Sequence, residues 1–313
     1  MRQNILVTGA SGLVGKALIR CLRSSPYVLH GQYFSRPISS SSEHFHCCDL
    51  RQKQDVLRLV QKTRPRAIVH LAAVMHGNET DMHRINVEGT RSLIGAVQKT
   101  RTEHLIFMSS CAVYDRIPPG ARIREEYRIA PAGCYARTKK KAEDLIVQAA
   151  KKNGFSYTIF RGHMIYDLHT DNNLSRLKNL LIRFRLVPLL AGGHFCVQPL
   201  HRDDAAGILS RSILNKGAYN KCYNLAGPDP VMFRDLMVQL ADFLHLKRVF
   251  IPVPAKLALF LANFSRPGSS IPDREELVRA MQNSSYDISG LVTDFRFRPQ
   301  GLDQRLRHEN SPD

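Results

Sequence analysis

Tyr135 and Lys139 have the residue types and the spacing of a proton-transfer pair. The segment Tyr135-Ala-Arg-Thr-Lys139 places a phenol and an ammonium four residues apart, so that they are neighbours on one face of a helix. A tyrosine with an ordinary pKa of about 10 acts as a base near neutral pH only if that pKa falls by about three, which corresponds to about 4 kcal/mol. One adjacent cation typically lowers a pKa by about 1–3. Lys139 would therefore do much of this work, although the spacing alone is common by chance.

Another hydroxyl stands at the end of a predicted strand. Ser110 follows the apolar run Leu105–Ser109 and begins the segment Ser110-Cys-Ala-Val-Tyr114. Ligands of parallel sheets bind at the carboxyl ends of the strands. Ser110 would therefore hydrogen-bond the substrate oxygen and stabilise a developing alkoxide or carbonyl. The alternative is a serine-rich strand end that caps its own backbone.

A glycine-rich turn near the N-terminus predicts a dinucleotide site. Its glycines follow the apolar run Ile5–Thr8 and open a predicted helix, which is the context that such a fingerprint requires. Glycine permits the tight turn and the approach of the backbone to a pyrophosphate, while N–H groups at the helix start attract the phosphates. An ordinary glycine-rich turn is the alternative. The cofactor contacts predicted here are Gly9, Ser11, Gly12, Leu13, Val14 and Gly15.

The strand end Gly31–Arg36 bears on the choice between the two nicotinamide dinucleotides. It holds no carboxylate that would bind the 2′-hydroxyl of NAD, whereas Ser35 and Arg36 can bind the 2′-phosphate of NADP. A surface arginine in a loop is the alternative. We therefore expect NADP rather than NAD. The positive nicotinamide ring of the oxidised cofactor would supply the remaining fall in the pKa of Tyr135.

Short β-branched runs alternate with amphipathic segments in the first half of the chain, which predicts an α/β fold with a doubly wound parallel sheet. The expected strands are Ile5–Thr8, Val28–Phe34, Ala67–Leu71, Leu105–Ser109 and Tyr157–Arg161. The expected helices are Leu13–Arg23, Lys53–Thr63, His83–Thr100 and Tyr135–Lys152, followed by helical stretches near Asn173–Arg185, Asp203–Leu214 and Phe233–Leu244. We expect a Rossmann domain at 1–165 and a smaller α/β substrate lobe at 166–313, not cleanly separable.

The composition indicates a globular protein with a cleft that favours anions. The 313 residues include 45 Lys and Arg against 27 Asp and Glu, a net charge of +18, but no nucleic-acid motif, so we expect a small anionic substrate and no nucleic acid. No stretch approaches the roughly 18 apolar residues that span a bilayer. Without a signal-peptide pattern, we expect a cytoplasmic protein with no membrane partner. Seven cysteines with no Cys-x-x-Cys pair favour reduced thiols and no metal site.

The order of the motifs along the chain resembles that of the extended short-chain dehydrogenases/reductases, the NAD-dependent epimerase/dehydratase group. Beside the glycine loop, the serine segment and the Tyr/Lys pair, the matching segments are Cys48–Leu50, His70–Ala73, Asn86–Thr90, Pro199–Asp204 and Asp294–Pro299. The resemblance covers nearly the whole chain. It implies that Ser110, Tyr135 and Lys139 form the catalytic triad, and that Lys139 also holds the nicotinamide ribose.

The same resemblance implies roles for residues outside the triad. Asp49 and Leu50 would contact the adenine end of the cofactor, and the backbone of Leu71, Ala72 and Ala73 would line it. Asn86 would stabilise the sheet and the active-site helix. The resemblance also implies a homodimer formed through the helices at about 83–100 and 135–152.

Departures from the family pattern bear on the reaction. Sugar 4,6-dehydratases carry an Asp-Glu pair where this chain has Cys111 and Ala112, so we discount dehydration and retain epimerisation or ketone reduction. Cys111 is an additional acid/base candidate, against the alternative of a small buried thiol. Met164 replaces a substrate-contacting Asn, Asp167 replaces a Gly, and Arg202 replaces an apolar residue.

Candidate substrate contacts are His76, Cys111, His163, Met164 and Arg202, with a structural role as the alternative for the two histidines. A nucleotide-sugar 4-epimerase or 4-ketoreductase is favoured by basic residues of the second lobe, namely Lys178, Arg183, Arg185 and Arg202. A reductase of a lipid-like or steroid-like ketone is favoured by the apolar segment 251–264. A non-catalytic NADP-binding regulatory subunit is a third possibility, against which the intact triad argues.

Overall fold

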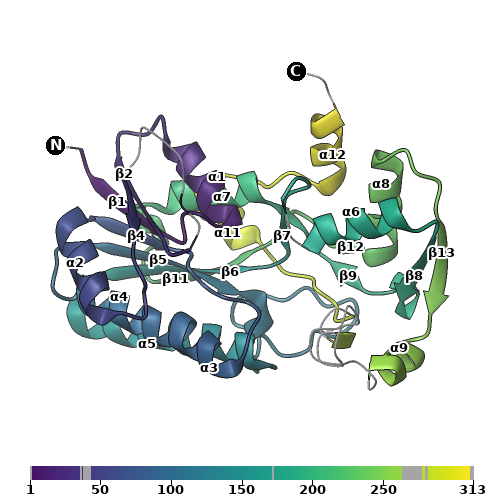
Figure 1. The fold of residues 1–313 in the computed structure, drawn as a ribbon, viewed down its shortest axis with the longest axis horizontal. Coiled ribbons are helices and arrows are strands. Elements are labelled where there is room, and N and C mark those ends of the chain that lie inside the picture. The colour runs from purple at the N-terminus through teal and green to yellow at the C-terminus, as the bar shows by residue number, and fades with distance from the viewer. Residues whose placement is uncertain are drawn as a thin grey trace.

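Seven parallel strands form one sheet in the order β11-β6-β5-β4-β1-β2-β3 (Figure 1). The structure is a computed structural model that describes residues 2–35, 37, 44–170, 173–262, 277–278 and 281–310. The strands are β1 (Asn4–Thr8), β2 (Val28–Tyr33), β3 (His44–Cys47), β4 (Ala67–His70), β5 (His104–Ser110), β6 (Ser156–Gly162) and β11 (Lys221–Leu225). The chain runs from β1 to β2 on one side and reaches β4 on the other. A crevice for ligands opens at such a reversal of strand order.

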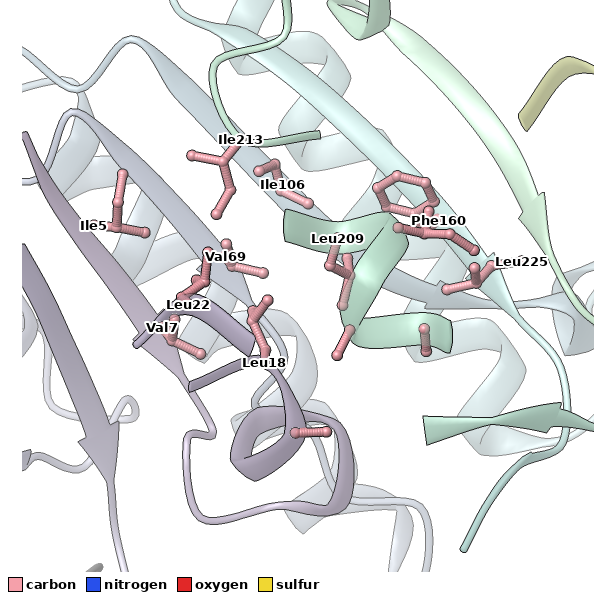
Figure 2. Packing of buried hydrophobic residues seen from close by; sticks show 14 of the residues in the cluster. Ile5, Val7, Leu18, Leu22, Val69, Ile106, Phe160, Leu209, Ile213 and Leu225 are labelled. Carbon is pink, nitrogen blue, oxygen red and sulfur yellow. The ribbon is translucent and has the colours of Figure 1, made fainter. Parts of the chain in front are cut away.

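Helices cover both faces of the large sheet. One face carries α2 (Lys53–Thr63), α4 (Gly89–Val97) and α5 (Cys134–Asn153), and the other carries α1 (Leu13–Leu22), α7 (Arg202–Ser212) and α11 (Ser289–Phe295). Figure 2 shows Leu18 of α1 and Leu209 of α7 in one hydrophobic cluster with Val7 and Val69 of the strands. Strands buried on both faces need apolar residues throughout, which explains the continuous apolar runs in the sequence.

The smaller lobe contains three two-stranded sheets with helices packed around them. Its strand pairs are β7 (Ile165–Tyr166) with β10 (Leu200–His201), β9 (Cys196–Val197) with β12 (Val231–Met232), and β8 (Leu186–Leu190) with β13 (Val249–Val253). Its helices are α6 (Asn173–Arg183), α8 (Phe233–Phe243), α9 (Ala255–Ala262) and α12 (Leu302–Asn310). Throughout the described part of the chain, every helix is too short or too polar to cross a membrane.

The predicted α/β fold class is confirmed, with some differences in detail. The single helix expected at His83–Thr100 is α3 (Glu79–Met82), a π-helical segment (His83–Glu88) and α4 in succession. Strands β3 and β11 were not expected. Because β11 pairs with β6 and α7 packs on α1, residues 202–225 return to the large sheet. The predicted domain boundary at 165/166 stays a prediction. Residues on both sides of it contribute to the large sheet and its covering helices.

Candidate functional site

One cavity of about 670 Å³ lies at the carboxyl ends of β1, β4, β5 and β6, beside the smaller lobe. Cavities of this size suit small-molecule ligands and cofactors. The predicted site residues that line it are Gly9, Gly12, Leu13, Val14, Gly15, Leu71, Ala73, Ser110, Cys111, Tyr135, Lys139, His163 and Met164. The structure thus brings the glycine loop, the three catalytic candidates and part of the expected substrate side into one space.

The glycine loop fits closely against its neighbours, which explains why side chains are excluded there. Gly9 has a φ of +67°, and a Cβ on it would lie 2.7 Å from the backbone nitrogen of Ala72. A Cβ on Gly15 would lie 2.3 Å from the carbonyl oxygen of Gly9. Gly12 precedes α1 and offers no capping side chain, so the first N–H groups of that helix are available to a phosphate. The loop is therefore a cradle into which a pyrophosphate fits.

Gln32 positions this loop, although the sequence analysis did not single it out. Its Oε1 accepts the N–H of Gly9 at 3.0 Å, and its Nε2 donates to the carbonyl oxygen of Cys48 at 2.6 Å. The side chain is buried within the sheet, where a polar residue must be hydrogen-bonded. A glutamine inside a predicted apolar strand was the signal that could have identified it.

Ser110 and Tyr135 interact through their side chains. Burial raises the pKa of the Tyr135 hydroxyl to about 12, and a hydrogen bond with the Ser110 side chain opposes that rise. The Ser110 oxygen also accepts the N–H of Ala112 at 3.2 Å, so it caps the following turn as well as contacting the tyrosine. The two interpretations of Ser110 given above are therefore compatible.

Lys139 lies one turn further along α5 and is buried. Its Nζ lies 4.4 Å from the centre of the Phe107 ring. Burial lowers the pKa of Lys139 to about 7, and the negative charge of Glu143 partly opposes this. The expected lowering of the pKa of Tyr135 by Lys139 is not seen, because burial raises the pKa of the tyrosine.

Asn86 connects the loop after β4 to the active-site helix. Its side-chain amide exchanges hydrogen bonds of 2.9 Å with both backbone groups of Val74 and donates to the Thr138 hydroxyl at 3.0 Å. Thr138 in turn donates to the carbonyl oxygen of Tyr135 at 2.8 Å. Asn86 therefore occupies the place between sheet and helix that the family resemblance implies, within a π-helical turn of a kind often found at functional sites.

His70 extends this network to the first strand. Its ring nitrogens lie 2.7 Å from the Thr8 hydroxyl and 3.0 Å from the Thr90 hydroxyl. Thr90 donates to the carbonyl oxygen of Asn86 at 2.6 Å. Burial, followed by the charge of Lys139, lowers the pKa of His70 to about 3, so this histidine is neutral at physiological pH. His70 is therefore a structural residue on the side of the cavity where the glycine loop and the Asn86 network lie, which we call the cofactor side.

The side of the cavity where the sequence leads us to expect the substrate, which we call the substrate side, is formed by the end of β6 and by a segment near the C-terminus. The Cys111 thiol donates to the carbonyl oxygen of Arg161 at 3.0 Å, and burial raises the pKa of that thiol, which favours a structural rather than an acid/base role. The His163 ring centre lies 5.0 Å from that of Tyr286. His163 Nε2 is buried with no hydrogen-bond partner among the described residues, and burial lowers the pKa of His163 to about 4.

Several predicted cofactor contacts lie outside the cavity in this structure. Asp49 forms an ion pair with Arg51 at 2.7 Å, which holds the pKa of that carboxyl below its usual value. Arg36 lies outside the described residues. The other predicted contacts that do not line the cavity are Ser11, Ser35, Leu50, Ala72 and Asn86.

Two predicted substrate contacts are not where they were expected. His76 is exposed and does not line the cavity. The Arg202 guanidinium forms an ion pair with the buried carboxylate of Asp167, away from the cavity. Asp167 and Arg202, which both depart from the family pattern, thus neutralise each other's charge. The basic residues expected to hold a diphosphate, Lys178, Arg183, Arg185 and Arg202, do not line the cavity either. Lys178 instead donates to the carbonyl oxygen of Leu168 at 2.6 Å.

Tyr286, Asn283 and Val278 line the cavity but were not predicted. All three precede α11, Val278 in a helical stretch and Asn283 and Tyr286 outside helices, and no periodicity or motif of the sequence marks them. Arg161 was likewise overlooked. It is buried and pairs with both carboxylate oxygens of Glu143, at 2.9 and 3.1 Å, so that it fixes β6 to α5.

The match to known families covers most of this site. Residues 5–225 match the NAD dependent epimerase/dehydratase family, a range that contains the glycine loop, the Asn86 network and the triad candidates. The chain belongs to that family. It is thus a member of the extended short-chain dehydrogenase/reductase enzymes, which bind an NAD(P) cofactor.

Relatives of this family member share 22–30% identity with it over the matched regions. An uncharacterised protein of Mycobacterium tuberculosis is 26% identical over 264 residues, 83% of this chain, but the chain spans only 25% of that protein's length. The N-acetyl-alpha-D-glucosaminyl-diphospho-ditrans,octacis-undecaprenol 4-epimerase of Escherichia coli O157:H7 is 22% identical over 99% of this chain and 96% of its own. The decarboxylating sterol-4-alpha-carboxylate 3-dehydrogenase of Saccharomyces cerevisiae is 27% identical over 50% of this chain and 49% of its own.

Solved structures show the same fold at low sequence identity. The UDP-glucose 4-epimerase of Thermotoga maritima, determined with UDP-glucose, superimposes with a TM-score of 0.80 at 18% identity, covering 97% of this chain and 96% of its own. The UDP-glucose 4-epimerase of Thermus thermophilus, determined with NAD, gives a TM-score of 0.79 at 19% identity over 97% of each chain.

Proposed function

We propose that this family member is an epimerase or ketoreductase that uses NADP to transfer a hydride at a secondary alcohol or ketone, with Ser110, Tyr135 and Lys139 as catalytic residues. The convergence of these three side chains in one cavity with the glycine cradle carries the proposal. The cofactor supplies or accepts the hydride when bound. The residues of this chain supply the proton and hold the reacting oxygen.

Tyr135 acts in this proposal as a proton donor to a ketone oxygen. A hydroxyl whose pKa burial has raised to about 12 is protonated at physiological pH and is ready to donate. Ser110, already hydrogen-bonded to Tyr135, would hold the same oxygen while its negative charge develops. Removing a proton from an alcohol, the opposite direction, requires the pKa of Tyr135 to fall when the positive nicotinamide ring is close.

The preference for NADP rests on Ser35 and Arg36. The strand end that carries them lacks a carboxylate for the ribose 2′-hydroxyl. Arg36→Ala is expected to weaken NADP binding about tenfold, the loss of roughly one charge-assisted contact, while NAD binding changes little. Calorimetric titration of both cofactors against both proteins measures this. An equal loss for NADP and NAD would remove the 2′-phosphate role.

A nucleotide-activated sugar is the substrate that we propose first. The printed names of the Escherichia coli relative and of the Thermotoga structure give diphosphate-linked or nucleotide-linked sugars. The net charge of +18 is compatible with an anionic substrate. An extended sugar diphosphate would need basic contacts at the edge of the cavity, where Arg116 is the one Lys or Arg besides Lys139 among the described lining residues.

A reductase of a lipid-like or steroid-like ketone is a second candidate, favoured by the apolar substrate side. Met75, Ile117, Met164, Ile165 and Val278 line it. The yeast relative carries the name of a sterol dehydrogenase. Such a substrate would bury apolar surface there without needing the missing diphosphate contacts.

Two measurements together test the proposed function. Mass spectrometry of small molecules released from the purified protein would identify a bound cofactor and any nucleotide sugar. Turnover is then followed with UDP-glucose or a 3-ketosteroid as probe, by NADPH absorbance for reduction and by chromatographic separation of the 4-epimers for epimerisation. Conversion of UDP-glucose supports the first candidate and reduction of the steroid the second. A protein that binds neither cofactor would contradict both.

A further inference from the structure

The smaller lobe exposes five large apolar side chains at the end of the molecule that carries β13. They are Ile182, Phe184, Leu186, Val249 and Ile251, each 43–58% exposed, and we call them the lobe face. Parallel pairing of β8 with β13 places Leu186 beside Val249, while Ile182 and Phe184 precede β8 at the end of α6. In Figure 1, β13 lies at the outer edge, opposite β1, β2 and α2.

The two strands beneath the lobe face are apolar on both sides, but the described residues cover only one side. Val187 and Leu189 point into the core and are almost fully buried. Leu186 and Pro188 alternate with them and are exposed, as is Ile251, the partner of Pro188. Parallel strands in proteins are normally covered on both faces. Exposed apolar patches of this kind mark interaction surfaces.

The charge around the lobe face determines which partner fits. The two segments that form it, residues 174–190 and 244–262, contain seven Lys and Arg and no Asp or Glu. Arg183 and Arg185 are exposed and flank Phe184 in the sequence, with the Arg183 guanidinium carbon 5.4 Å from the centre of the Phe184 ring, and Lys247 is exposed two residues before Val249. A second copy of this face would bring like charges together. An anionic bilayer instead satisfies both properties, since it attracts the basic groups and accepts the apolar side chains between its headgroups.

We propose that the lobe face docks this protein on an anionic lipid bilayer. The sequence analysis predicted no membrane partner because no segment can span a bilayer, but peripheral docking requires only a surface. The polypeptide connects this surface to the cavity. After β13, α9 packs through Ala258 and Ala262 against Leu277 and Met281, whose neighbours Val278 and Gln282 line the cavity. The docking does not depend on which reaction the cavity supports.

Co-sedimentation of the full chain with vesicles tests the proposal. The vesicles contain either phosphatidylcholine alone or equal parts phosphatidylcholine and phosphatidylglycerol. The unmodified protein is expected to sediment with the mixed vesicles and to remain in solution with the neutral ones. The double variant Arg183→Glu, Arg185→Glu should bind the mixed vesicles at least about 25-fold more weakly, because each of the two basic groups near an anionic surface contributes about a fivefold gain.

A matched variant separates the lobe face from net charge. Lys99→Glu with Arg101→Glu reverses the same number of exposed charges near α4, at the other end of the molecule, and should bind as the unmodified protein does. Phe184→Ser tests the apolar contribution and should also weaken binding. Thermal unfolding verifies that each variant is folded. Absence of sedimentation with mixed vesicles, or equal loss in both double variants, would overturn the proposal. So would a dimer that Phe184→Ser dissociates in light scattering.

Discussion

The two sides of the cavity differ in how completely their buried polar groups are hydrogen-bonded. On the cofactor side, an unbroken chain of hydrogen bonds runs from Thr8 through His70, Thr90 and Asn86 to Thr138. On the substrate side, His163 Nε2 is buried without a partner in the described part of the chain, as is Ser109 Oγ where β5 reaches the cavity.

This difference indicates where the protein is fixed and where it is adapted to its ligand. A fully bonded polar network is rigid and holds one geometry, which suits a cofactor site shared across a family. A buried polar group without a partner is costly, and a ligand that bonds to it recovers that cost on binding. The substrate side also contains Met164, at a φ of +40° that side chains rarely adopt. Specificity is therefore expected to reside on this side.

Tyr135→Phe should give the largest effect, because it removes the proton donor from the place where the two sides meet. Loss of a general acid–base group lowers turnover by about 10³-fold, while the ring and its packing are retained. Cofactor affinity should stay within about twofold, since the lost hydroxyl contacts Ser110 and the reacting oxygen. Single-turnover kinetics and cofactor titration measure the two quantities. A variant with full activity would eliminate the proposed mechanism.

Asn86→Ala should cause the largest loss of stability of the substitutions considered, because it opens the network of the cofactor side. Three side-chain hydrogen bonds of about 1 kcal/mol each are lost, so the free energy of unfolding should fall by about 3 kcal/mol. Asn153→Ala serves as the control, since its exposed amide makes one bond to a helix carbonyl. Urea denaturation compares them. Equal small losses in both variants would show that the network contributes no special stability.

Lys139→Met should alter the pH dependence of stability. Burial lowers the pKa of Lys139 from 10.5 to about 7, so the unfolded chain binds more protons than the folded one between these values. The folded state is therefore penalised below pH 7, and the penalty is relieved as the pH rises toward 10.5. Without cofactor, Lys139→Met should stabilise the protein by up to about 5 kcal/mol below the folded-state pKa, at about 1.4 kcal/mol for each pH unit between 7 and 10.5, and the gain should shrink at higher pH. A gain that does not vary with pH in urea denaturation would contradict the assigned pKa.

On the cofactor side, the glycine loop and the Tyr135/Lys139 pair line the cavity as the sequence predicts, whereas Ser11, Ser35, Asp49, Leu50, Ala72 and Asn86 do not. Gly9, Gly12 and Gly15 stand in a local pattern with a backbone reason for each glycine, and Tyr135 with Lys139 occupies one helix face. Such local rules depend on a few consecutive residues, so they survive without knowledge of the fold. The strands β1, β4, β5 and β6 were found for the same reason, to within one residue at most ends.

The substrate side was predicted only in part: Cys111, His163 and Met164 line the cavity as expected, but its other contacts join distant segments. Tyr286 meets His163 across more than a hundred residues, and Arg202 turns away to Asp167, a pairing that no spacing rule signals. Strand β3 was missed because its sequence, His-Phe-His-Cys, has the polar character of an edge strand. The pKa of Tyr135 is raised and that of Lys139 is lowered because both side chains are buried, and the four-residue spacing gives no information about burial.

His163→Leu should have the smallest effect on stability and gives the most direct test of the contrast between the two sides. Because Nε2 has no partner in the described structure, replacing the ring by an apolar side chain should leave the free energy of unfolding unchanged or raise it by up to about 1 kcal/mol. His70→Leu is the matched control. It removes a more deeply buried, neutral histidine whose two ring nitrogens are both bonded, and should cost about 2 kcal/mol or more. If His163 contacts the substrate, His163→Leu also raises the KM for the substrate identified in the turnover assay without changing cofactor affinity. Equal destabilisation by the two substitutions would mean that the two sides of the cavity do not differ as argued.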